Sequence, residues 1–338
     1  MKNEGRINHL TSKLNKSSLS FFLSAGLLRS IATFLLSISV GEFYQLCFQT
    51  GGAKARLLER AGVHLENIES FFIFFGVLVL IKMAADFAEN YLMNQAAENY
   101  VQNLREYIFQ VQLTWPSDHF GRRHFGKYLL RYSNDMKAVQ NYISRGIYGG
   151  WRDALFLLVG IATLYLLNNE LASIYLFMMI VSVIVIFYIS RRQIPIIEYS
   201  RNKRNQLLAF VTKSFQRHTR IKTDQIESKI IGRYSKYSEE LKNLNLKYHR
   251  FDSSLLSLFT FLQYGIIVIL LYRIYQIHQL SPDKQDIGTA LVFLLIVLQI
   301  NPTLKRIMKV PSIINKGGIS LKKIQRIKPV TTESTDQM

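Results

Sequence analysis

The stretch from His119 to Asp135, HFGRRHFGKYLLRYSND, is basic, aromatic and punctuated by glycine. It lies about midway between two strongly apolar segments, residues 69–88 and 147–168. A loop that only joins two membrane spans can be short, whereas this connection is about 55 residues long and rich in helix-forming residues. The stretch therefore predicts a helical structure outside a bilayer, held there by membrane helices on either side.

Six apolar blocks organise the 338-residue chain, and blocks of about 20 apolar residues are long enough to cross a bilayer as helices. The predicted fold is all-α, a polytopic membrane protein with six transmembrane helices and long cytoplasmic helical extensions. We expect spans over about 22–46, 69–90, 147–168, 171–190, 253–275 and 288–308. The expected domains are a cytoplasmic N-terminal segment (1–18), a transmembrane domain (19–328) and a polar cytoplasmic tail (329–338).

The net charge of +19 is unevenly distributed between the connections. Of the 42 Lys and Arg residues, 34 lie before the first span, in the two long connections, or from the end of the sixth span (Lys305) onward, against four in the alternate connections. This asymmetry is the positive-inside pattern, and it predicts that both termini face the cytoplasm. Because topology accounts for the charge, we do not expect nucleic acid as a partner.

The two long connections share one predicted design. Val101, Leu104 and Ile108 continue the second span at helical spacing, and Pro116 ends the pattern. Apolar residues at helical spacing also flank a basic turn at 217–223. Each connection is therefore expected to be a helix out, a short turn and a helix back.

Catalytic and metal-binding patterns are absent from the sequence. The run Gly121–Tyr128 approaches the phosphate-binding loop G-x-x-x-x-G-K-[ST]. However, Tyr128 stands where Ser or Thr would hold magnesium, and no apolar strand precedes the loop. The chain has one cysteine, Cys47, and its seven histidines show no metal-ligand spacing. We expect no catalytic residue and no metal site on this chain.

Polar residues within the spans are candidates for a cavity or a hinge. Lys82, Asp86 and Glu89 are spaced by four and three, so they share one helix face. They predict either a paired ladder at a helix interface or the polar wall of a central cavity. Arg29 is expected near the cytoplasmic end of the first span, where it can snorkel. Four further candidates, for which simple interhelical packing is the alternative, are Gln263, Gln299, Asn301 and Pro302.

Three motifs follow one another along the six spans. They are the run Gly126, Leu129 or Leu130, Arg131 and Asp135, then Ile221-Lys222 with Glu227, and then Gly288, Pro302 and Ser320 to Ile327. In this order, over about residues 20–328, the chain resembles the six-helix, type 1 transmembrane domain of ATP-binding-cassette (ABC) exporters. Within the first motif, Arg131 and Asp135 stand at i,i+4 and predict a helix ion pair, which could also contact a motor domain.

The resemblance implies a permease subunit of an exporter in the bacterial inner membrane, moving a lipid, a peptide or a drug-like molecule. It also implies a homo- or heterodimer of transmembrane subunits, surrounded by membrane lipid. ATP and magnesium are expected on a separate ATPase subunit and no cofactor on this chain, because about ten residues follow Ile327. A non-transporting scaffold, a truncated half-transporter and a membrane sensor remain as alternatives.

The same resemblance implies that the two basic turns fit grooves on the ATPase subunit. In the first turn these coupling residues are His119, Phe120, Arg122, Arg123, Phe125 and Gly126. In the second turn they are Arg217, His218, Thr219, Arg220, Ile221 and Lys222.

The predicted topology can be tested by cysteine labelling in intact cells, in a Cys47→Ser background. A membrane-impermeant reagent added from outside should label a cysteine at Gly51 or Lys284, since these connections carry few basic residues. It should not label a cysteine at His124 or His218. Labelling at either histidine position would refute the six-span topology.

Overall fold

The computed structural model describes residues 16–48, 67–116, 131–192, 194–280, 285–325 and 327. Within these ranges the chain forms helices and turns, and no strand. The helices are α2 (Lys16–Phe48), α4 (Ile68–Leu113), η1 (Arg131–Asp135), α7 (Met136–Asn141), η2 (Tyr142–Tyr148), α8 (Gly149–Leu167), α9 (Asn169–Arg191), α10 (Ile194–Gln216), α11 (His218–Thr223), α12 (Glu227–Leu280), α13 (Gln285–Ile307) and α14 (Val310–Gln325).

Six of the helical runs are long and apolar enough to cross a membrane. Each expected span lies on one of them to within two residues. The predicted all-α membrane fold is therefore confirmed. The division of the chain at residues 18 and 328 stays a prediction.

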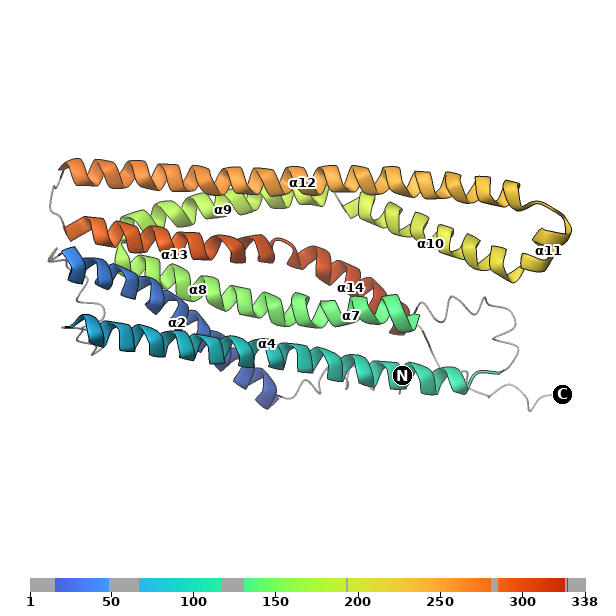
Figure 1. The fold of residues 1–338 in the computed structure, drawn as a ribbon, viewed down its shortest axis with the longest axis horizontal. Helices are drawn as coiled ribbons and strands as arrows, with labels where there is room; N and C mark the ends of the chain where they lie inside the picture. Colours follow the sequence, from blue (N-terminus) through green and yellow to red (C-terminus); the bar gives the residue numbers. More distant parts are fainter. Residues whose placement is uncertain are drawn as a thin grey trace, which may run out of the picture.

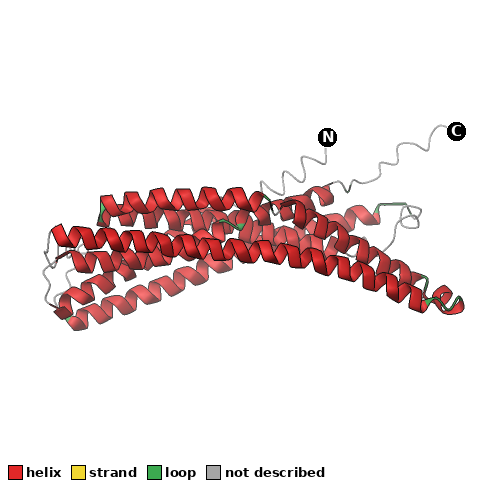
Figure 2. Ribbon diagram, turned by 90° about the horizontal axis from the view of Figure 1, so that it is seen from above, coloured by secondary structure: helices red, strands yellow, loops and turns green. Residues whose placement is uncertain are grey.

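The helices form an elongated bundle with two unlike ends (Figure 1). At one end, here called the turn end, α8 passes directly into α9 at Asn168, whose side chain accepts hydrogen bonds from the first backbone amides of α9. At the other end, the extension end, α10, α11 and α12 project furthest (Figures 1 and 2). With 46 and 54 residues, α4 and α12 are at least twice as long as a bilayer crossing needs.

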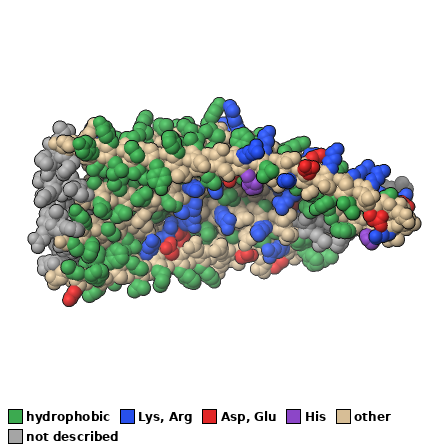
Figure 3. Space-filling model, turned by 45° about the horizontal axis from the view of Figure 1, so that its top comes forward, with side chains coloured by type: hydrophobic (Ala, Val, Ile, Leu, Met, Phe, Trp, Pro, Cys, Tyr) green, Lys and Arg blue, Asp and Glu red, His purple; other side chains and the backbone are tan. Residues whose placement is uncertain are grey.

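Side-chain chemistry changes along the bundle. In Figure 3, hydrophobic side chains gather toward the turn end of the visible face, while Lys and Arg gather over its middle and the extension end. Apolar side chains at the turn end are also widely exposed, including Phe72, Phe177 and Phe261. This division fits a lipid-facing part that continues into a water-facing part.

Two hydrophobic clusters hold the bundle together. The first joins α2, α8, α9, α12 and α13 around Tyr175, Phe293 and Ile296. The second joins α2, α4, α7, η2 and α14 around Leu104 and Met136. The apolar row expected beyond the second span is buried in this second cluster. The expected stop is also observed, since α4 ends at Leu113 before Pro116.

The first extension consists of the part of α4 beyond the second span and of the return helix formed by η1, α7 and η2. The last described helix, α14, lies against α7 and η2 of this return helix. Its buried residues are Gly317, Ser320 and Ile324. A Cβ atom added to Gly317 would lie 2.2 Å from Tyr142 Cβ and 2.9 Å from the Ala138 carbonyl oxygen. Only a residue without a side chain therefore fits at this crossing.

Gly317→Ala should destabilise the folded chain by about 1–3 kcal/mol, because both neighbours of the added methyl belong to or adjoin the backbone. Gly318→Ala is the matched control, since an added Cβ there meets nothing within 4 Å. The control should be neutral or stabilising, because alanine favours helix over glycine by about 1 kcal/mol. Thermal unfolding of the purified chain in detergent measures both, and equal midpoints would contradict the close packing of α14.

Candidate functional site

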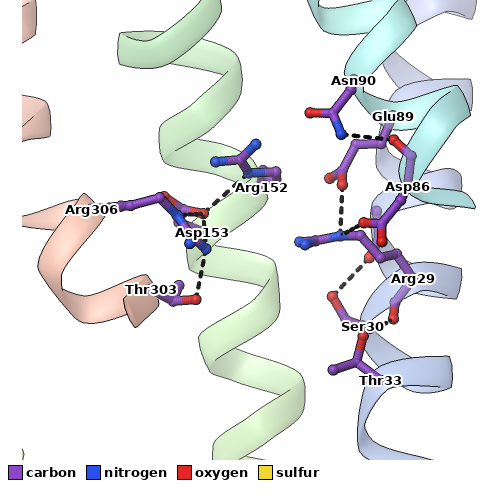
Figure 4. A network of polar contacts seen from close by, with 11 residues as sticks. Arg29, Ser30, Thr33, Asp86, Glu89, Asn90, Arg152, Asp153, Thr303 and Arg306 are labelled. Atoms are coloured by element: carbon purple, nitrogen blue, oxygen red, sulfur yellow. Dashed lines mark hydrogen bonds and ion pairs between the residues drawn. The ribbon is translucent and has the colours of Figure 1, made fainter. Parts of the chain in front are cut away.

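Four long helices are connected by buried ion pairs (Figure 4). Arg29 on α2 places Nε 2.6 Å from Glu89 Oε2 and 3.7 Å from Asp86 Oδ1, both on α4. The Arg29 side chain is 12% exposed and that of Glu89 is 1% exposed. Gly26 makes room for this carboxylate, because a Cβ there would lie 2.6 Å from Glu89 Oε1.

A second ionic group lies between α8 and α13. Arg306 Nε donates to both carboxylate oxygens of Asp153, at 3.1 and 3.3 Å, and its Nη2 donates to Asp153 Oδ1 at 3.1 Å. Arg306 Nη2 also donates to Thr303 Oγ1 at 2.8 Å, which fixes the guanidinium on its own helix. Arg152 Nε donates to the same carboxylate from α8 at 3.1 Å.

The two groups are neighbours across the α2–α8 contact. The Arg29 guanidinium carbon lies 5.3 Å from the centroid of the Phe156 ring on α8, a cation–π contact. Figure 4 shows the Arg29 side chain extending from α2 toward α8, the helix that carries Arg152 and Asp153. Here "ion network" means the three arginines and three carboxylates, which balance in charge: Arg29, Arg152, Arg306, Asp86, Glu89 and Asp153. Glu89 and Asp153 are buried, whereas the side chains of Asp86 and Arg306 are 40% and 44% exposed. Buried charges in a membrane bundle need such pairing, because transfer to a low-dielectric medium is costly.

Of the three ionisable candidates on α4, Asp86 and Glu89 face Arg29. Lys82 lies one turn away, half-buried, and forms no ion pair with a described residue. The three residues therefore do not form one paired ladder, and their part in a cavity wall stays a prediction. The expectation that Arg29 snorkels is wrong, because its side chain turns inward to these carboxylates.

The amide candidates lie on two helices. Gln263 is buried on α12, while Gln299 and Asn301 are half-buried on α13. Among the described residues, both polar atoms of Gln263 and the amide oxygens of Gln299 and Asn301 have no hydrogen-bond partner. Pro302 lies inside α13, which continues to Ile307. These buried amide atoms are therefore left without a hydrogen bond inside the described part of the chain.

The second basic turn forms a short helix, α11, at the tip of the extension end. Arg217, His218, Thr219, Arg220 and Lys222 are exposed and Ile221 is half-buried. Arg220 pairs with Asp224 at 3.4 Å, and Lys222 pairs with Glu227 at 2.9 Å. Gln225 has a φ of 49°, the left-handed conformation that reverses the chain into α12. The turn is thus a short, exposed basic helix that is stabilised by two local ion pairs.

The coupling residues of the first basic turn, His119 to Gly126, lie outside the described residues. From the adjoining motif, Asp135 forms contacts with distant elements. It accepts a hydrogen bond from Ser320 Oγ on α14 at 2.8 Å and lies 3.5 Å from Arg201 Nη2 on α10. Asp135 therefore makes tertiary contacts, beyond the local pair expected with Arg131.

Sequence reasoning missed several members of these groups: Arg152, Asp153, Arg201 and Arg306. One signal was available for the network. Arg29, Asp153 and Arg306 are charged residues at similar depth in three different spans, and charges at membrane depth pair with one another. Among the described residues, no group of three or more His, Cys, Asp and Glu could hold a metal ion.

Comparisons with known proteins agree with this architecture. Residues 6–301 match the family described as the ABC transporter transmembrane region. An ATP-dependent lipid A-core flippase of Nitrosococcus oceani is 22% identical over 243 residues, which are 71% of this chain and 40% of the flippase. A Rickettsia felis protein described as an export ATP-binding/permease protein is 22% identical over 111 residues, which are 33% of this chain and 19% of that protein.

The chain therefore spans well under half the length of these relatives. The family match covers most of the chain and includes five of the six apolar helices and the beginning of the last. This chain belongs to the family of ABC transporter transmembrane regions.

Proposed function

We propose that the chain is the membrane-spanning permease subunit of an ABC-type exporter, driven by ATP hydrolysis on a nucleotide-binding subunit. The observation that carries this proposal is α11, a basic helix at the tip of a two-helix extension. Its residues are too hydrophilic to pack against lipid, and they stand far beyond the apolar part of the bundle. A short basic helix in this position suits a groove on a water-soluble partner.

The extension is built to transmit movement from that partner. α11 is followed within four residues by α12, which continues without interruption to the turn end. A continuous helix carries a displacement along its axis, since its backbone bonds are all internal. Binding of ATP by the partner would thus move α11 and, through α12, the membrane part of the bundle.

The polar groups inside the bundle support a translocation path between the helices. The unpartnered amides of Gln263, Gln299 and Asn301 need hydrogen bonds from substrate, water or a second subunit. Lys82 and the part-exposed Asp86 would form part of the polar wall, with the Arg29–Glu89 and Arg306–Asp153 pairs closing one end. Pro302 weakens the backbone bonds of α13 locally and suits a hinge.

The proposed substrate is an amphipathic molecule, namely a lipid, a peptide or a drug-like compound. One relative is named for lipid A-core flipping and another for export, and both names fit such a cargo. The proposed location is the bacterial inner membrane, with the extension end and both termini in the cytoplasm. A homo- or heterodimer with a second transmembrane subunit would cover apolar surface that one bundle leaves exposed.

Coupling through the two basic turns is tested by Ile221→Asp and by Phe120→Ala combined with Phe125→Ala. Loss of a buried apolar anchor from an interface costs about 2 kcal/mol, or about a thirtyfold weaker affinity for the ATPase subunit. Pull-down of that subunit and stimulation of its ATPase activity measure the effect. Lys229→Ala, an exposed change just beyond the tip, is the control. Full binding and full transport in both test variants would show that these turns are not coupling surfaces.

Replacement of the Arg29–Glu89 pair separates a structural from a transport role. Glu89→Leu leaves Arg29 with Asp86 at 3.7 Å, and the loss of one buried partner should cost about 3 kcal/mol of stability. Arg29→Met with Glu89→Leu removes both charges and should restore most of the thermal stability. If this stable double variant also transports at the full rate, the pair does not belong to the path. The surface change Glu106→Gln on α4 is the control.

A further inference from the structure

Arg201 lies near the start of α10, yet its side chain contacts two other elements. Its Nη2 donates to Ser320 Oγ on α14 at 3.0 Å and lies 3.5 Å from Asp135 Oδ1 on η1. Ser320 Oγ in turn donates to the same Asp135 oxygen at 2.8 Å. The second extension, the return helix of the first extension and the helix after the sixth span therefore meet at one carboxylate.

The neighbours of Arg201 on α10 behave differently. Ser200 donates to Asn245 at 2.7 Å and Lys203 pairs with Glu240 at 2.8 Å, both within the α10–α12 hairpin. The hairpin of residues 194–250 is here called the arm, and these contacts bond its two helices, α10 and α12, to each other. Arg201 instead crosses from the arm to the rest of the bundle, and Lys316 of α14 lies 6.0 Å from the Tyr248 ring centroid on the arm.

The arm has little apolar packing to fix its position. No described side chain between residues 195 and 250 is buried. By contrast, the return helix of the first extension buries Met136, Val139 and Ile143. An element with few buried contacts moves at low free-energy cost. Polar contacts such as those of Arg201 therefore decide where the arm rests.

The Arg201 contacts can both form and release. Ser320 is fully buried, but the side chains of Asp135 and Arg201 are 17% and 29% exposed. A charge-assisted hydrogen bond in such a half-buried place is stronger than one at the surface. When the contact opens, both charges can reach water, so no ion is stranded in an apolar interior.

Arg201 lies near the base of the arm, so a displacement there is enlarged at the tip. α9 ends at Arg191 and α10 begins at Ile194, and Pro195 has no backbone N–H with which to continue the helical bonds. Pro195, in the first turn of α10, therefore leaves the base of the arm with fewer helical hydrogen bonds than its middle. Arg201 lies six residues beyond Pro195, and Gln216 at the tip lies a further 15 residues, or about 22 Å, away. A small shift at Arg201 therefore becomes a larger shift of α11.

We propose that Arg201, Ser320 and Asp135 form a reversible latch that holds the arm against the body of the bundle. Arg201 is a positioning residue, which sets where α11 stands when it meets its partner. The purpose of the latch rests on the proposed transport function, since an arm coupled to an ATPase must occupy at least two positions. Its existence does not, because the latch can be measured on this chain alone.

The test measures the distance between arm and body by pulsed electron spin resonance on the full chain in lipid nanodiscs. Spin labels are placed on cysteines at the exposed positions Lys213 on α10 and Lys322 on α14, after Cys47→Ser. Arg201→Ala should raise the ratio of released to latched arm about tenfold, the shift expected for loss of a hydrogen bond to a charged group. A longer-distance population should therefore grow.

Lys203→Ala is the matched control, since it breaks an ion pair of the same helix within the arm. It should leave the distance between arm and body unchanged. Asp135→Asn, which keeps an acceptor but removes the charge, should give a smaller shift in the same direction. Ser320→Ala, a loss of one hydroxyl, should do the same and serves if Arg201→Ala does not fold.

Identical distance distributions for the parent and the latch variants would overturn the proposal. So would an equal shift in Lys203→Ala, because the effect would then be a general loosening of α10. Neither result would affect the exporter assignment, since the ATPase subunit takes no part in the measurement. Conversely, failure to recover an ATPase partner would remove the proposed function and leave the measured latch in place.

Discussion

A bilayer offers no water to backbone amides and carbonyls, so a chain that crosses it must satisfy these groups within its own helices. In this protein the helices do not end where the apolar sequence ends. α4 and α12 continue as unbroken hydrogen-bonded rods well beyond the length that a membrane requires. The same bonds that permit insertion therefore also build the extensions, and α12 makes one rigid piece from the turn end to the vicinity of α11.

The low dielectric of the membrane interior also decides where charge is placed. The two buried carboxylates, Glu89 and Asp153, each pair with an arginine, Glu89 with Arg29 and Asp153 with Arg306. The amides of Gln263 and Gln299 differ, since in the described structure they keep polar atoms without partners. A cost of this kind is tolerated where another molecule supplies the missing bonds. The contrast separates polar residues that hold the bundle from those suited to a substrate or a second subunit.

Local patterns in the sequence were enough to predict the spans. Block length and periodicity depend on nearby residues, and they correctly indicated the six apolar helices, the stop before Pro116 and the buried row on α4. Contacts between distant helices were not predictable in this way. Periodicity tells which face of a helix is buried, but not which helix covers it, so Arg29 was assigned to the interface rather than to Glu89.

Asp135 illustrates the same limit at the proposed latch. Its spacing from Arg131 predicts a local ion pair, and that pair stays a prediction. The structure shows contacts to Arg201 and Ser320, which lie 66 and 185 residues away. The first basic turn, around Phe120, lies outside the described residues, and its role stays a prediction.

The two extensions are held in physically different ways, and this difference assigns them different mechanical roles. The return helix of the first is packed into a hydrophobic cluster with α4 and α14, where any displacement would open apolar surface. The arm of the second is held by half-exposed polar contacts at its base, while at the turn end Arg273 of α12 donates to Glu170 of α9 at 2.8 Å. For movement to pass through a helical bundle, one part must stay fixed while another part moves. In the transporter proposed above, the packed extension would provide the fixed support, and the arm would be the element whose position changes at small free-energy cost.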